Sequence, residues 1–294
     1  MAREGASRGG SGFAEPLVRM PPPVSFTFDL EDHRSGLDPA SRFVDATYRV
    51  VDLLATLRLA GTFFVVGTVA ERHPTLVRDI AAAGHEIAFH GFDHTPLDED
   101  DPSTFAEQTM RGKRLLEQLV GRAVVGYRAP IFSLVRRTIW AADALAAAGF
   151  TYSASVIPAT NPRYGFGAAP RHPFRWPSGV LELPAATTAF AGVQLPFLGG
   201  VYFRYLPISL VLRRVQRMTS GGLWTYLHPY DCDPDEGWTR VERTTVFESA
   251  ILSCNRRRTL AKVRRLLAAC GGACLSDRVR AGEFAGAPAG PIVG

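Results

Sequence analysis

Short apolar runs alternate with longer segments of helical periodicity along most of the chain. Residues 24–30 (VSFTFDL) are rich in strand formers and end on acidic side chains, whereas residues 43–61 carry apolar side chains three and four positions apart. This alternation continues to residue 157 and returns later at LWTYL. We expect strands at residues 24–30, 62–67, 85–90, 124–130, 150–157 and 223–227, and helices at 43–61, 74–84, 104–121, 138–149 and 255–267.

A series of strands and helices of this kind predicts a parallel sheet with helices outside it, either an open doubly wound sheet or a closed barrel. Two observations favour the barrel. Polar side chains gather where the expected strands end, and no glycine-rich phosphate-binding loop follows the first strand. We therefore predict an α/β fold of the (β/α) barrel type in a single domain.

The two ends of the chain lack this alternation. Residues 1–22 are rich in Gly, Ser and Arg and run into a triple proline, so we expect a disordered leader there. The barrel is expected over residues 23–270, closed by an amphipathic helix within that range. Residues 271–294 contain mostly Ala, Gly and Pro near the end, which predicts a flexible tail.

Composition excludes several classes of protein. With 46% hydrophobic and 21% charged residues in 294, the chain is typical of a globular protein with a sizeable core. The net charge of +5 is not accompanied by a basic stripe with interleaved aromatics, so we expect no nucleic-acid partner. We also expect no transmembrane segment, no secretory signal and hence a cytoplasmic location, with four reduced cysteines.

The first candidate site is FDLEDH, where Asp29, Glu31, Asp32 and His33 follow the first expected strand. Three carboxylates so close together repel one another unless they share a proton or a cation. A metal site or a raised pKa is therefore one interpretation, and a solvated loop after the strand is the other.

The second candidate is HGFDH, with His90 and His94 four positions apart after another expected strand. Such a pair offers two imidazoles from one helical face or one tight loop, although an exposed pair can also be accidental. Two imidazoles and one carboxylate make a metal site with open positions, which is typical of catalytic centres. Zinc is the expected ion, and cobalt or manganese would suit the same ligands.

Two further stretches carry single candidates. Arg128 ends an expected strand in GYRAP, where its guanidinium could orient a carboxylate of a neighbouring strand. His228 follows LWTYL and could titrate near neutral pH without binding a metal. Each alone is equally compatible with a structural role.

Taken in order, FDLED, HGFDH, RAP and LHP resemble the polysaccharide deacetylase family, also called the NodB-homology or carbohydrate esterase 4 family. The resemblance covers about residues 24–235. The phrases LELPAATTAFAGVQLPFLGGVYFRYLP and YLHPYDCDPDE further resemble a branch associated with bacterial exopolysaccharide production.

This resemblance implies a distorted (β/α) barrel of seven or eight units and a divalent-metal-dependent hydrolase that removes N-acetyl groups from amino sugars. Asp29 matches the general base, and His90 and His94 match metal ligands. Arg128 matches the residue that orients the base, and His228 matches the general acid.

Three assignments remain open within the resemblance. For the third metal ligand we favour Asp32, while strand alternation keeps Glu31 as the alternative. The backbone N–H of Ile131, after Pro130, is the expected donor to the oxyanion. The matching branch has an Asp before the serines of Tyr152-Ser153-Ala154-Ser155, and Asp231 or Asp233 could replace it.

The expected substrate is an N-acetylated bacterial glycan or its lipid-linked or nucleotide-linked precursor. Tyr202 and Phe203, in a glycine-opened apolar loop, are the expected sugar-stacking residues. Association with a polysaccharide biosynthesis complex is also expected. Two alternatives are a hydrolase of a small cyclic amide on the same barrel and a degenerate member that binds glycan without catalysis.

Overall fold

The structure is a computed structural model that describes residues 20–33, 42–160, 164–190, 192–219, 221–238 and 245–291. The predicted leader over residues 1–22 lies outside these ranges except for its last three residues. Within them, no helix combines the length and the apolar character needed to cross a membrane.

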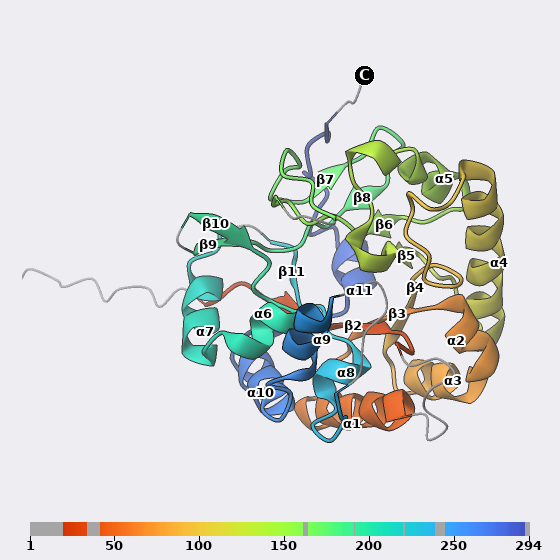
Figure 1. The fold of residues 1–294 in the computed structure, drawn as a ribbon. Coiled ribbons are helices and arrows are strands. Elements are labelled where there is room, and N and C mark those ends of the chain that lie inside the picture. The colour runs from red at the N-terminus through yellow and green to blue at the C-terminus, as the bar shows by residue number, and fades with distance from the viewer. Residues whose placement is uncertain are drawn as a thin grey trace, which may run out of the picture.

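The predicted α/β barrel is confirmed (Figure 1). A seven-stranded sheet has the order β2-β3-β4-β5-β6-β8-β7, in which β7 alone is antiparallel to its neighbour. The strands are β1 (Val24–Ser25), β2 (Thr27–Leu30), β3 (Thr62–Val65), β4 (Glu86–Phe89), β5 (Gly126–Tyr127), β6 (Tyr152–Ser153), β7 (Phe174–Arg175), β8 (Leu181–Glu182), β9 (Thr188–Phe190), β10 (Val193–Leu195), β11 (Leu223–Trp224) and β12 (Gly271–Gly272).

The barrel closes through the first strand. β1, which leads directly into β2, pairs in parallel with β11 on one side and β12 on the other. The bridge between Phe28 and Leu227 extends this contact toward the strand ends. Between β8 and β11 the link is a side-chain hydrogen bond, from Trp224 Nε1 to the Leu183 carbonyl oxygen at 3.1 Å. The barrel is therefore distorted on this side.

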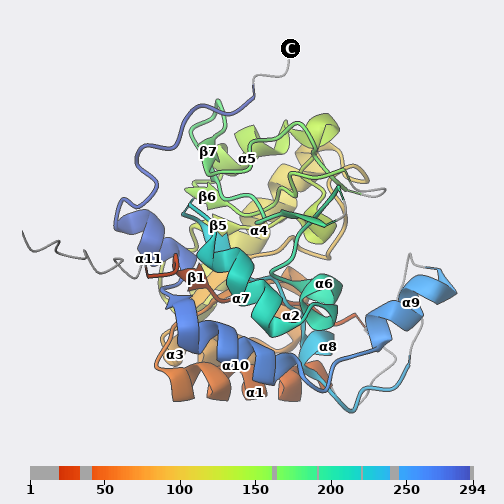
Figure 2. The same cartoon turned by 90° about the vertical axis from the view of Figure 1, so that its left-hand side faces the viewer.

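Helices surround the sheet, and α10 runs beside α1 on its outside (Figure 2). The helices are α1 (Arg42–Leu57), α2 (Gly67–Arg72), α3 (Pro74–Ala82), α4 (Pro102–Val120), α5 (Ala141–Ala147), α6 (Gly200–Tyr205), α7 (Ile208–Gln216), α8 (Pro229–Cys232), α9 (Val246–Ser253), α10 (Thr259–Cys270) and α11 (Leu275–Arg280), with 3-10 turns η1 (Pro130–Phe132) and η2 (Arg136–Thr138).

Local sequence explains the helix boundaries. The carboxylate of Asp101 caps α4 by accepting hydrogen bonds from the backbone N–H groups of Ser103 and Thr104, at 2.9 and 3.1 Å. Pro102 occupies the first helical position, where its missing N–H costs nothing. Gly121 ends the helix with φ of 68°, a left-handed conformation that glycine adopts without strain.

Strand alternation divides the core into two layers. Phe63, Val65 and Phe89 belong to the large cluster that packs between the sheet and the outer helices. Phe64 and Ala88, at the alternate positions, belong to a second cluster that also holds Trp224 and fills the barrel. Because Asp29 pairs in register with Phe64, its carboxylate also lies on the inner side.

The end of the chain differs from the prediction of a flexible tail over residues 271–294. In the part that the structure describes, β12 pairs with β1, and α11 docks against the amino-terminal end of the barrel. The buried Glu86 carboxylate accepts a hydrogen bond from the Ser276 N–H at 2.9 Å, and Thr62 Oγ1 accepts one from the Leu275 N–H at 2.9 Å. The Ala- and Gly-rich composition of this segment gave no indication that the backbone N–H groups of Leu275 and Ser276 bind buried side chains.

Candidate active site

Four strands bring the predicted polar residues together at the carboxyl end of the barrel. Asp29 lies in β2, His90 follows β4, Arg128 follows β5, and His228 follows the bridge that extends β11. The Asp29 side chain is almost completely buried. Because parallel strands end on the same face of a barrel, residues far apart in sequence meet there.

Arg128 holds the Asp29 carboxylate. Its Nη1 forms an ion pair with Asp29 Oδ1, and its Nε donates to the Ala154 carbonyl oxygen at 3.0 Å. The guanidinium lies over the Phe64 and Trp224 rings, with its carbon 3.9 and 4.3 Å from their centroids. Both members of the pair are fully buried, and the guanidinium keeps the carboxylate in one orientation.

HGFDH forms a tight loop rather than a helix, and it presents both imidazoles to one carboxylate. Gly91 and His94 have φ values of 75° and 64°, in the left-handed region. His94 Nε2 lies 2.6 Å from Glu31 Oε2, and the candidate ligand atoms of Glu31, His90 and His94 lie within 4.8 Å of one another. This donor set fits a divalent transition metal with open positions.

The protonation states suit metal binding. Burial lowers the pKa of His90 to about 4, against the opposing charge of Asp29, so this imidazole is neutral near pH 7. Its Nδ1 lies 2.9 Å from the Arg128 carbonyl oxygen, which leaves Nε2 for a ligand. Burial would raise the pKa of Glu31, but the charge and hydrogen bond of His94 outweigh it and hold that pKa below its usual range.

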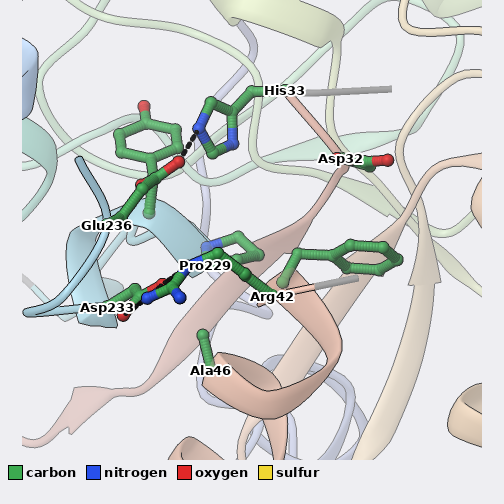
Figure 3. A pocket seen from close by; sticks show the side chains of 9 residues that line it. Asp32, His33, Arg42, Ala46, Pro229, Asp233 and Glu236 are labelled. Atoms are coloured by element: carbon green, nitrogen blue, oxygen red, sulfur yellow. Dashed lines mark hydrogen bonds and ion pairs between the residues drawn. The ribbon is translucent and has the colours of Figure 1, made fainter. Parts of the chain in front are cut away.

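The geometry therefore groups Glu31, and not the favoured Asp32, with the two histidines. Glu31 stands two positions after Asp29, so strand alternation places both carboxylates on the inner side of the barrel. Asp32 lies instead at a neighbouring pocket, next to His33 and Arg42 (Figure 3).

Two polar side-chain contacts line that neighbouring pocket. His33 Nε2 lies 2.7 Å from Glu236 Oε1, and Arg42 Nη2 lies 2.7 Å from Asp233 Oδ2 (Figure 3). Tyr230 separates this pocket from the candidate catalytic histidine, since its ring contacts both His33 and His228. Asp233 is therefore paired with Arg42 in this pocket, away from the serines beside which the sequence analysis expected an acid.

Asp231 is the carboxylate beside His228. Its Oδ2 lies 2.9 Å from His228 Nδ1, and His228 Nε2 lies 3.7 Å from Asp29 Oδ2. Burial alone would lower the pKa of His228, but the hydrogen bond and charge of Asp231, with the charges of Glu31 and Asp29, raise it to about 9. His228 is therefore protonated at neutral pH and can donate a proton.

The acid beside the serines is Glu182 in β8, which the sequence did not indicate. Glu182 Oε1 accepts hydrogen bonds from the backbone N–H groups of Ser155 and Val156, at 2.7 and 3.0 Å. Ser155 Oγ in turn accepts one from the Ala129 N–H at 2.8 Å, so this carboxylate supports the segment that carries Arg128. A lone acid inside the apolar run VLELP is the signal that could have revealed it.

Pro130 and Ile131 lie beside the HGFDH loop. A Cβ on Gly91 would come within 2.8 Å of Pro130 Cγ, so the two loops touch closely. Ile131 and Phe132 have φ values of 55° and 58°, a strained conformation for side chains of this size. Strain of this kind is common where a backbone group must face a reacting centre, which fits the expected role of the Ile131 N–H.

The two residues expected to stack on sugar differ in their environments. Phe203 is fully buried in the core, so its predicted contact with substrate is wrong. The physical reason is that residues 200–205 form the helix α6, and Phe203 points to the side that packs inward. Tyr202 on the same helix is partly exposed, and its contact with a sugar stays a prediction.

Two family models match the chain. Residues 19–152 match the family described as polysaccharide deacetylase, and residues 154–273 match a domain of unknown function, DUF3473. The first match contains Asp29, His90 and Arg128, and the second contains His228 and Asp231.

Curated relatives share the first region. A chitooligosaccharide deacetylase of Bradyrhizobium sp. (strain ANU 289) is 31% identical over 115 residues, which are 39% of this chain and 50% of that protein. Another, of Sinorhizobium fredii (strain NBRC 101917 / NGR234), is 32% identical over 143 residues, or 48% of this chain and 59% of that protein. The chain thus spans about half the length of the curated relatives that it matches.

Solved structures share the fold. A Mycobacterium smegmatis protein whose name assigns it to the polysaccharide deacetylases has a TM-score of 0.61 at 23% identity, over 96% of this chain and 98% of that one. PuuE allantoinase has a TM-score of 0.55 at 17% identity, over 88% and 89%. Residues 19–152 are thus similar to the polysaccharide deacetylase family, and residues 154–273 are similar to the domain of unknown function DUF3473.

Proposed function

We propose that the protein is a metal-dependent hydrolase that removes N-acetyl groups from the amino sugars of a glycan. One observation carries this proposal: the Glu31, His90 and His94 cluster lies directly beside a buried carboxylate and a protonated histidine. Amide hydrolysis needs a base to activate water and an acid to protonate the departing amine, and these groups supply both.

Asp29 is the proposed base. The Arg128 ion pair orients its Oδ1, while Oδ2 lies 3.9 Å from His90 Nε2 and 3.7 Å from His228 Nε2 and so faces the centre of the site. A divalent ion held by the three ligands would supply Lewis-acid activation of water and of the acetyl carbonyl. Asp29 would take the proton that the attacking water loses.

His228 is the proposed acid. An amine anion is a very poor leaving group, so the sugar nitrogen must receive a proton as its bond to the acetyl carbon breaks. His228 Nδ1 is occupied by Asp231, which leaves the Nε2 proton for transfer. General acid catalysis of this kind typically contributes about 10² to 10⁴ in rate. The Ile131 N–H is the proposed donor to the oxyanion.

The names of the relatives suggest the first substrates to test. Chitooligosaccharide deacetylases and a peptidoglycan-N-acetylglucosamine deacetylase of Bacillus cereus are among them. We therefore propose N-acetylglucosamine oligomers as substrates, with a lipid-linked or nucleotide-linked precursor of an exopolysaccharide as the narrower alternative. Comparing acetate release from the oligomer with release from a nucleotide-linked N-acetyl sugar separates the two.

The decisive experiment combines metal content with acetate release, in wild type and in His90→Ala/His94→Ala. Arg213→Met, at an exposed position of α7, serves as the control. We expect close to one zinc, cobalt or manganese ion per wild-type and control chain, acetate release by both, and loss of metal and acetate in the double variant. Metal retained by the double variant, or no metal in any chain, would refute the proposed site.

A second function keeps the site and changes the substrate. The likeness to allantoinase concerns the fold alone, yet it shows that the same architecture occurs in an enzyme named for a cyclic amide. Metal binding by wild type without acetate release from any glycan, together with hydrolysis of allantoin, would favour this alternative. Metal binding with neither activity would favour a non-catalytic glycan-binding protein.

A further inference from the structure

The DUF3473 region places an arginine behind the proposed acid. Arg204 of α6 has its Nε 2.8 Å from Asp231 Oδ1, while Asp231 Oδ2 lies 2.9 Å from His228 Nδ1. The side chains of Arg204 and Asp231 are both fully buried, and His228 is 15% exposed. Asp231 thus lies between two cationic groups, one of which can lose its proton and one of which cannot.

Arg204 is itself fixed in place from the carboxyl-terminal part of the region. Its Nη1 donates to the Cys254 carbonyl oxygen at 2.6 Å. Its own carbonyl oxygen accepts hydrogen bonds from Asn255 Nδ2 and Lys262 Nζ, both at 2.6 Å. These bonds to the guanidinium and to the backbone of Arg204 hold its side chain beside Asp231.

The charges of the three groups change in a simple way when His228 reacts. With His228 protonated, the three groups together carry one positive charge, and after His228 gives up its proton they are neutral. Without Arg204 the same step would change a neutral pair into an isolated buried carboxylate. An unpaired charge in a fully buried position is costly, so that step would be opposed.

We propose that Arg204 is a positioning residue that balances the charge of Asp231 and thereby allows His228 to release its proton to the departing amine. This inference rests on the proposed role of His228 as the general acid. It also gives the DUF3473 region a role in the reaction. The region supplies the acid His228, the carboxylate of Asp231 that orients this acid, and the positive charge of Arg204 that allows the acid to release its proton.

The other groups around His228 have their own partners. From β2 and the residue after it, Asp29 is paired with Arg128, and Glu31 is paired with His94. From α8, Tyr230 stacks on the imidazole with ring centroids 4.7 Å apart. Farther out, Arg256 is paired with Glu236. Arg204 is therefore the cation in direct contact with Asp231 on the side away from His228.

The test measures the titration of His228 itself. The imidazole signals of wild type, Arg204→Met, Arg204→Lys and Asp231→Asn are followed by NMR against pH, and His228→Asn identifies the signal. Removing the arginine charge should raise the pKa of His228 by about one unit or more, whereas Asp231→Asn should lower it. Arg204→Lys should stay close to wild type, as should the exposed control Arg213→Met.

Acetate release is measured on the same proteins. We expect Arg204→Met to lower kcat about tenfold or more, to leave KM within about twofold and to retain its metal. Arg204→Lys should recover most of the loss. The dependence of kcat on pH is measured as well. Its alkaline limb should shift in opposite directions in Arg204→Met and Asp231→Asn. These opposite shifts indicate charge balance, because a merely structural role would not move the limb in this way.

A folded Arg204→Met whose His228 titrates at or below the wild-type value would overturn the proposal. If Arg204→Met does not fold, Arg204→Gln and the double variant Arg204→Met/Asp231→Asn take its place. The double variant should fold, and its His228 should titrate above that of Asp231→Asn, because Asp231→Asn alone leaves Arg204 as an unpaired buried cation near the imidazole. A His228 pKa at or below that of Asp231→Asn also overturns the proposal. If wild type releases no acetate, the proposed function fails while the NMR titration still tests the charge balance.

Discussion

A single position just after β2 determines which carboxylate reaches the candidate metal centre. Side chains two apart on a strand face the same side, so Glu31 follows Asp29 inward. Asp32, one position later, faces the pocket that Arg42 and His33 line. The sequence offered both acids, and only the direction of the backbone after Leu30 separates them.

This geometry makes a paired prediction for metal affinity. Glu31→Gln should weaken binding of the divalent ion about tenfold or more, since an amide oxygen lacks the charge of a carboxylate. Asp32→Asn, the neighbouring change of the same kind, should bind the ion as wild type does. Competition with a chromophoric chelator measures both affinities. Equal losses in the two variants, or a greater loss in Asp32→Asn, would restore Asp32 as the ligand.

The residues that sequence analysis missed share one property. Glu182 and Arg204 are single charged residues within apolar runs, VLELP and VYFRYLP. Each is completely buried and has partners more than twenty residues away along the chain, such as Ser155 for Glu182 and Cys254 for Arg204. Sequence spacing carries no information about such partners, whereas FDLED and HGFDH concentrate their signal within a few residues.

At the scale of elements, α6 shows how a short helix sends neighbouring side chains into different environments. Successive side chains on a helix point about 100° apart. Tyr202 is partly exposed, Phe203 enters the core, and Arg204 reaches Asp231. The sequence favoured a loop here because two glycines open the run, and it therefore did not separate these three directions.

The burial of Phe203 predicts a stability effect. Phe203→Ala should lower the free energy of unfolding by about 3 to 5 kcal/mol, because it leaves a cavity in the core. KM of the folded fraction should change by less than about twofold. Urea unfolding followed by circular dichroism gives the first quantity, and Tyr202→Ala is the partly exposed control. A raised KM with unchanged stability would instead support the sugar-stacking role.

Elements of the first half were predicted well, whereas after residue 157 the predictions at residues 223–227 and 255–267 correspond to β11 and α10 and the other described elements were missed. The predicted helix at residues 104–121 corresponds to α4, and the predicted strand at 85–90 contains β4, because both have clear periodicity and end signals. In contrast, β7, β8 and β10 have two or three residues each and are too short to show alternation. Their pairing is set by tertiary contacts.

At the scale of the whole molecule, the two family regions form one barrel. The boundary between the matches falls at residue 153, inside β6, which pairs with β5 on one side and β8 on the other. The proposed base and metal ligands come from the first region, and the proposed acid comes from the second. Neither region contains the complete candidate site.

The carboxyl-terminal segment supports a prediction for a shortened chain. Ending the protein at Ala273 removes α11 and leaves the buried Glu86 and Thr62 without the donors Ser276 and Leu275. The melting temperature should fall by about 10 °C or more, since bonds to a buried carboxylate are worth about 1.5 to 3 kcal/mol each. Thermal unfolding followed by circular dichroism measures this. An unchanged melting temperature would favour the flexible tail.

The position of β1 has a consequence for synthesis. Val24 pairs with Leu223 on one side and with Gly271 on the other, so the strand made near the beginning finds its partners only near the end. During translation the growing sheet would carry an unpaired edge at β1 and β2 until most of the chain has left the ribosome. Such edges invite pairing with other chains. Closure of this barrel is therefore a late event, and the nascent protein depends on whatever shields that edge until then.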